Sequence, residues 1–202
     1  VPGDGDPIVR LGNVNKSHVY VYDNGWRYGT VLDLDESLGP CVEDEVNDVA
    51  QLNDATGTNG WYICVDDENE YAEGYRIPYV WRKASNFERD TYSWLGSTNG
   101  TVRTSALSGL KYVFDNDSWR PATDYESNSS LGACVKENNG LVHKSGESDQ
   151  SWYRCTNDVP ATVDGFKIDY TWRVASSSEA DTAGFAKITG LQSKMVYKGN
   201  LN

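Results

Sequence analysis

Residues 81–90 read WRKASNFERD, and nearly the same decapeptide returns three more times along the chain. The other copies are WRYGTVLDLD at 26–35, WRPATDYESN at 119–128 and WRVASSSEAD at 172–181. Seven Trp residues placed at random in 202 positions would give fewer than one Trp-Arg dipeptide, whereas this chain has four. We therefore expect a repeat protein, in which copies that cannot bury an apolar face alone pack on one another.

The spacing of the four copies alternates between long and short. Their tryptophans, Trp26, Trp81, Trp119 and Trp172, are separated by 55, 38 and 53 residues. The true unit is therefore double, with an A copy at Trp26 or Trp119 and a B copy at Trp81 or Trp172. Because tryptophan occupies the first position of the decapeptide in every copy, we predict that these four side chains form the repeat core.

The decapeptide predicts a strand that ends at Trp-Arg and a short helix that follows it. In each copy Ser or Thr stands three residues before an acid, in the pairs Thr30/Asp33, Ser85/Glu88, Thr123/Glu126 and Ser176/Glu179. This is the pattern of a capping box, in which the hydroxyl and the carboxylate bind each other's backbone amides. A helix of about two turns should follow and end at a glycine, at Leu38-Gly39, Leu95-Gly96, Leu131-Gly132 or Ala183-Gly184.

The residues before each Trp-Arg predict β-hairpins. VYVYDNGWRYG at 19–29 alternates around Asp-Asn-Gly, and KYVFDNDSWRP at 111–121 repeats that pattern. The B copies, at 61–83 and 152–174, have longer loops. The expected fold class is mainly β with short helices (α+β), built from tandem β-hairpin plus short-helix repeats.

The four copies group into two homologous halves, which we expect to be linked internally by disulfides. The predicted boundaries are 1–106 for the first half and 107–202 for the second, which ends in a partial repeat strand. Of the three possible pairings of four cysteines, repeat symmetry selects Cys41–Cys64 and Cys134–Cys155. Disulfides imply an oxidising compartment. Metal binding is the alternative, although the chain has no CxxC motif.

The repeat resembles a known kind of sequence. The strings K/V-Y-V-x-D-N-x-W-R, W-Y-x-C and W-R-x-A-S-x-x-E-x-D-T-x-x-W/F are similar to repeats in large secreted and surface proteins of Fibrobacter-type bacteria, which degrade plant polysaccharide. The similarity runs from about His18 to Gly199 and carries no known chemistry. It implies an extracellular, non-enzymatic module on or near the bacterial cell surface.

Composition and motifs exclude several classes of function. A net charge of −12 leaves no basic stripe for nucleic acid, and no apolar run is long enough for membrane insertion. No hydrolase, P-loop, metalloprotease or dinucleotide motif is present, so we expect neither an enzyme nor a cofactor. The acidic runs at 33–37, 42–48 and 66–70 could hold calcium, but they lack the EF-hand spacing, and we expect no metal site. The arginines of Trp-Arg should pair with the acids of their own helix turn or stack on rings.

Two kinds of partner remain. The aromatic residues that break the repeat symmetry, Tyr71, Tyr75, Tyr92 and Trp94, are candidates for stacking on a glycan. Residues 191–200 resemble the opening strand of another A copy, so the segment 191–202 could add to a sheet of a second molecule. We therefore expect adhesion or head-to-tail self-assembly as a surface fibre subunit. Carbohydrate binding, as a lectin-like module for plant polysaccharide, is the alternative.

Overall fold

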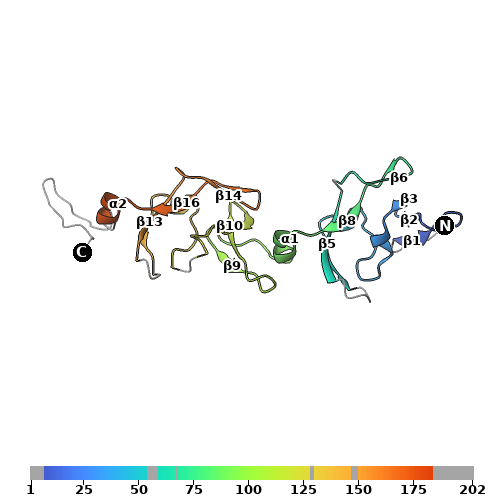
Figure 1. Cartoon of the computed structure of the whole chain (residues 1–202), viewed down its shortest axis with the longest axis horizontal. Coiled ribbons are helices and arrows are strands. Elements are labelled where there is room, and N and C mark those ends of the chain that lie inside the picture. The colour runs from blue at the N-terminus through green and yellow to red at the C-terminus, as the bar shows by residue number, and fades with distance from the viewer. Residues whose placement is uncertain (1–6, 54–58, 67, 128–129, 147–149, 184–202) are drawn as a thin grey trace. The chain divides into compact units, whose positions relative to one another are not determined.

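The computed structural model describes residues 7–53, 59–66, 68–127, 130–146 and 150–183 (Figure 1). The chain divides into two compact units, the first ending at Ser93 and the second beginning at Trp94. It is mainly β, with several small antiparallel sheets and two short helices. The sequence repeat predicts a boundary after residue 106, whereas the compact units divide before Trp94. The boundary lies earlier because Trp94 packs on Trp119 of the second unit. The predicted partial strand at 191–202 lies outside the described residues.

The first unit begins with a meander and continues with a second sheet and a small hairpin. Its strands are β1 (Ile8–Leu11), β2 (Val19–Tyr22) and β3 (Trp26–Gly29) in the order β1-β2-β3; β4 (Val49–Asn53), β5 (Asn59–Val65) and β8 (Val80–Lys83) in the order β4-β5-β8; and the pair β6 (Tyr71–Ala72) and β7 (Tyr75–Arg76). Its helical elements are the 3₁₀ turns η1 (Val31–Leu34) and η2 (Glu43–Glu45) and the helix α1 (Asn86–Thr91).

The described part of the second unit has its strands in a similar order, with one 3₁₀ turn where the first unit has two. Its strands are β9 (Val102–Thr104), β10 (Lys111–Asp115) and β11 (Ser118–Pro121) in the order β11-β10-β9; β12 (Val142–Lys144), β13 (Trp152–Thr156) and β16 (Thr171–Val174) in the order β12-β13-β16; and the pair β14 (Ala161–Val163) and β15 (Phe166–Ile168). Its helical elements are the 3₁₀ turn η3 (Lys136–Asn138) and the helix α2 (Ser177–Thr182). The β10–β11 turn places Asn116 and Asp117 at φ 51° and 65°, as a two-residue hairpin turn requires.

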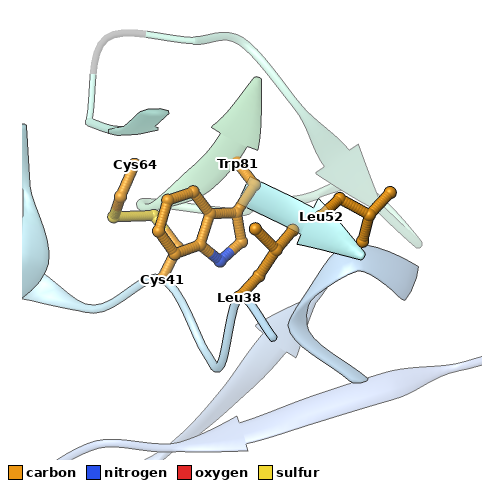
Figure 2. Packing of buried hydrophobic residues seen from close by; sticks show 5 residues of the cluster. All are labelled: Leu38, Cys41, Leu52, Cys64 and Trp81. Carbon is orange, nitrogen blue, oxygen red and sulfur yellow. A yellow bond between two sulfur atoms is a disulfide. The ribbon is translucent and has the colours of Figure 1, made fainter. Parts of the chain in front are cut away.

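Each unit contains one of the predicted disulfides, Cys41–Cys64 in the first and Cys134–Cys155 in the second. In the first unit the bridge packs with Leu38, Leu52 and Trp81, so that sulfur and indole share one core (Figure 2). The indole N–H of Trp81 donates to the carbonyl of Gly39 at 2.9 Å.

The core of the second unit is built in the same way. Trp172 packs with the Cys134–Cys155 bridge, and its indole N–H donates to the carbonyl of Gly132 at 2.9 Å. Gly39 and Gly132 both have φ of +70°, a conformation that glycine adopts without strain, and there the chain reverses to present its carbonyl to the indole. Trp81 and Trp172, only 5% and 2% exposed, are core residues as predicted.

The capping boxes of the B copies form as predicted. Ser85 accepts from the amide of Glu88, which binds the amide of Ser85 in return at 2.8 Å, and α1 follows. Ser176 and Glu179 repeat this arrangement at the start of α2. Both helices have six residues, and no helix in the described part of the chain is long and apolar enough to cross a membrane.

The helices predicted for the A copies are wrong. After Thr30 the chain makes only the 3₁₀ turn η1, and residues 124–127 form a turn. The acidic residue of the capping box explains why no α-helix forms in the A copies. One of its carboxylate oxygens accepts a hydrogen bond from the backbone amide of the cysteine eight residues later. Asp33 binds Cys41 at 2.8 Å and Glu126 binds Cys134 at 3.0 Å. The chain must turn back at once to make these bonds, which leaves no room for a second helical turn.

The prediction that all four tryptophans are core residues is wrong for Trp26. Trp26 is 54% exposed, whereas its counterpart Trp119 is 8% exposed. Trp119 is covered by the ring of Trp94 at 4.9 Å between centroids, and its indole N–H donates to the carbonyl of Leu95 at 3.1 Å. No described residue covers Trp26 in this way. The tryptophan of the A copy is therefore buried in the second unit, where a segment from outside the hairpin packs on it, and exposed in the first.

Candidate functional site

The aromatic rings of the first unit gather on the outer face of the sheet β1-β2-β3. Val19 and Val21 of β2 are buried at 3% and 0% exposure, so the alternate residues Tyr20 and Tyr22 point to the opposite face. The sequence VYVY thus separates an aliphatic inner face from an aromatic outer face. This alternation is the signal in the sequence from which the aromatic outer face could have been predicted. The predicted binding residues do not include Tyr20, Tyr22 and Tyr28.

Cross-strand pairs hold these rings together. Tyr22 lies opposite Trp26 with ring centroids 5.2 Å apart, and Tyr20 lies opposite Tyr28 with centroids 4.9 Å apart. Tyr75 of the β6–β7 hairpin stacks on Tyr28 at 5.8 Å and an interplanar angle of 24°. We call these five rings, Tyr20, Tyr22, Trp26, Tyr28 and Tyr75, the aromatic face.

One phenol of the aromatic face, that of Tyr28, has a raised pKa. A hydrogen bond with Tyr20, followed by burial, raises the pKa of Tyr28 to about 12. His18 lies at the edge of the face, 5.7 Å from the Tyr28 ring, and its Nε2 is 3.2 Å from a carboxylate oxygen of Glu73. A surface of clustered rings suits contact with another ring or with the apolar side of a sugar.

Beside Trp26 the surface is hollowed. A groove of about 520 Å³ is lined by Arg10, Leu11, Gly12, Asn13, Tyr20 and Trp26. We call it the Trp26 groove. The groove lies between rings of the aromatic face, Tyr20 and Trp26, and the cationic residue Arg10. It therefore combines a flat apolar wall with a positive charge.

The structure separates the four residues predicted to stack on a glycan. Tyr75 belongs to the aromatic face and is 67% exposed, and Tyr71 is 60% exposed on the neighbouring strand. Tyr92 is 51% exposed and packs on Trp61 in the first unit. Trp94 lies in the second unit, half-buried between other side chains, where it contacts Tyr112 and Trp119.

Three arginines of the Trp-Arg dipeptides pair with the acid of their own copy, as predicted. The pairs are Arg82–Glu88 at 2.6 Å, Arg120–Glu126 at 2.8 Å and Arg173–Glu179 at 2.8 Å. The hydrogen bond from Arg82 lowers the pKa of Glu88 to about 2, and the corresponding bond lowers the pKa of Glu179 further. These charges are used to hold the repeat together, so they are not available as an anion site.

Arg27 departs from this pattern because its acid is an aspartate, one methylene shorter than glutamate. It donates to the carbonyls of Cys41 and Tyr28 and lies 5.4 Å from the Tyr79 ring centroid. Burial lowers its pKa, although the charge of Asp33 acts in the opposite direction. Arg27 is therefore a structural arginine like the other three and not a ligand-binding one.

A second hollow, of about 540 Å³, lies in the second unit and is polar. Its lining includes Asn99, Asp115, Arg120 and Glu137. Asp115 binds Arg120 at 2.8 Å, and Asn99 donates to Glu137 at 3.3 Å. Since these groups already bind one another, the aromatic face with its groove is the better candidate site. Within the described ranges, no group of three or more His, Cys, Asp or Glu is placed to hold a metal ion.

Comparisons of the chain with protein-family models, with curated proteins and with solved structures give no match.

Proposed function

We propose that this chain is a non-enzymatic repeat protein of the extracellular space or bacterial cell surface, which acts in adhesion or self-assembly as a surface fibre subunit. In this proposal the chain consists of four hairpin copies in two homologous halves. The observation that carries it is the use made of the repeated side chains. Three of the four repeated indoles donate to carbonyls, three of the four repeated arginines bind acids, and the cysteines bind each other, so that the repeated chemistry maintains architecture.

The exposed aromatic face adds a surface for contact. Trp26 and Tyr75 are 54% and 67% exposed, and large rings are the residues that most often anchor protein interfaces. Two disulfides fit a protein of an oxidising compartment. Assembly head to tail, with residues 191–202 adding a strand to a sheet edge of the next molecule, follows from the sequence likeness of that segment to an A copy.

Self-assembly predicts that the sedimentation coefficient rises with protein concentration and that this rise depends on the segment 191–202. A chain that ends at Gly190 should remain monomeric at concentrations where the full chain forms oligomers. Sedimentation velocity from micromolar to millimolar concentration is the measurement. A shortened chain that assembles as the full chain does would remove strand addition from the proposal.

Carbohydrate binding is the second candidate, and the exposure of Tyr71, Tyr75 and Tyr92 favours it. On this hypothesis the protein is retained on insoluble cellulose or xylan, and Tyr75→Ala reduces the retained fraction several-fold. Tyr125→Ala, which removes a ring 40% exposed in the second unit, is the matched control. No retention of the unaltered protein on either polysaccharide would count against this candidate.

A further inference from the structure

The second unit shows how an aromatic side chain from outside a hairpin is held. Trp94 lies 4.9 Å from the Trp119 ring and 5.6 Å from the Tyr112 ring, both with edge-on geometry. The guanidinium of Arg103 stands over the Trp94 ring at 4.9 Å. The next residue, Leu95, accepts the Trp119 indole N–H at 3.1 Å. Two rings, a cation and an indole donor therefore form the seat that holds Trp94.

The first unit has the same receiving residues at the same positions of its sheet. Arg10 pairs with Tyr20 across β1 and β2, as Arg103 pairs with Tyr112 across β9 and β10. The other cross-strand pair corresponds as well, because Trp26 lies opposite Tyr22 just as Trp119 lies opposite Phe114.

In the first unit no residue that the structure describes occupies the corresponding place. The Trp26 groove, which Arg10, Tyr20 and Trp26 help to line, has a volume of about 520 Å³. Trp26 is 54% exposed, and its indole N–H has no hydrogen-bond partner among the residues that the structure describes. In the first unit Trp26 therefore supplies the ring and the indole N–H donor, and Arg10 supplies the cation. The equivalent groups of the second unit, Trp119 and Arg103, contact Trp94 and Leu95.

The sequence identifies a segment that fits the groove. Trp94 is the third residue after the end of α1 at Thr91, and Phe185 is the third residue after the end of α2 at Thr182. The two helices share the same capping box and length, so Phe185 is the counterpart of Trp94. The seven residues before β1, VPGDGDP, contain no aromatic ring.

We propose that the Trp26 groove is a docking site for Phe185 of a second copy of this chain. The inference rests on the proposed self-assembly and gives it a specific contact. Phe185 inserts its ring between Trp26 and Arg10, and the backbone carbonyl that follows accepts the Trp26 indole N–H. Repetition of this contact, together with strand addition by residues 191–202, joins one copy to the next, and oligomers of the unaltered chain require both contacts.

Complementary variants test the contact in the full-length protein. Trp26→Ala removes the groove and keeps Phe185, whereas Phe185→Ala keeps the groove and removes its occupant. Each variant alone should sediment as a monomer, and an equimolar mixture should form dimers and no larger species. Tyr125→Ala, which removes an exposed ring elsewhere, should assemble as the unaltered chain does.

A peptide separates this contact from the wider question of assembly. A fluorescently labelled peptide of residues 177–190 should bind the full-length Phe185→Ala protein, whose groove has no competing occupant. Addition of Trp26→Ala to that protein should weaken binding at least tenfold, and addition of Arg10→Ala should weaken it several-fold. The same peptide with Phe185→Ala should bind at least tenfold more weakly. Fluorescence anisotropy reports each affinity.

The outcomes distinguish the two proposals. If both variants assemble as the unaltered chain does, the groove contact is wrong and self-assembly stands. If the unaltered chain stays monomeric but the peptide binds through Trp26, self-assembly fails and the groove is a docking site for this segment. Absence of peptide binding overturns the inference, as does binding of xylan or cellulose oligosaccharides at Trp26 in place of the peptide.

Discussion

Replacement of Arg120 by alanine is expected to lower the free energy of unfolding of the second unit by about 3–5 kcal/mol. The Arg120 and Glu126 side chains are 7% and 0% exposed and form a bidentate pair, with N–O distances of 2.9 and 2.8 Å. Arg120 also binds Asp115 and the carbonyl of Cys134. Without the guanidinium, Glu126 is left as a buried carboxylate with no counterion. Urea denaturation with the disulfides intact measures the loss.

Arg173→Ala is the matched control, because Arg173 occupies the same position of its copy. The Arg173 and Glu179 side chains are 29% and 17% exposed, and Arg154 also binds Glu179, at 2.7 Å. Water and the second arginine compensate for the lost charge, so the expected cost is no more than about 1 kcal/mol. Equal losses in the two variants would show that burial does not set the strength of these pairs.

Trp172→Ala should destabilise the second unit by about 3–5 kcal/mol, the range for truncation of a buried large aromatic ring. Trp172 is 2% exposed and packs against the Cys134–Cys155 bridge. Its removal also leaves the Gly132 carbonyl without the indole donor that it has at 2.9 Å. Thermal unfolding followed by near-ultraviolet circular dichroism, in which the packed indole contributes, measures the effect.

Trp26→Ala provides the contrast, since Trp26 occupies the same column of the repeat. With 54% of its surface exposed, its replacement should cost less than about 1 kcal/mol in a dilute, monomeric sample. A loss as large as that of Trp172→Ala at the same dilution would mean that Trp26 is a core residue after all.

Features that depend on local sequence or on the symmetry between copies could be predicted. The hairpin turns need only the Asp-Asn signal, the B-copy capping boxes need only residues three apart, and the disulfide pairing follows from equal cysteine offsets. The helices expected after Thr30 and Thr123 could not be judged locally, because the carboxylates of Asp33 and Glu126 bind amides eight residues away.

The candidate site was harder to predict because exposure depends on partners outside the repeat column. Trp26 and Trp119 occupy the same position of the repeat, yet only Trp119 is packed against the ring of Trp94. Tyr75 was proposed from its position in a loop, but its stacking on Tyr28 required the β6–β7 hairpin to fold toward the first sheet. The sequence repeat therefore identifies equivalent positions, but it does not determine which of the equivalent side chains are buried by residues from outside the repeat.

The placement of the two sulfur bridges has a mechanical consequence. Each bridge joins residues 23 or 21 positions apart within one compact unit. When the chain is pulled by its ends, the residues inside each covalent loop bear no load. At about 3.5 Å per extended residue, each loop withholds roughly 70–80 Å of contour length until a reductant cuts it. The length to which this polypeptide can be extended therefore increases when a reductant cuts the bridges.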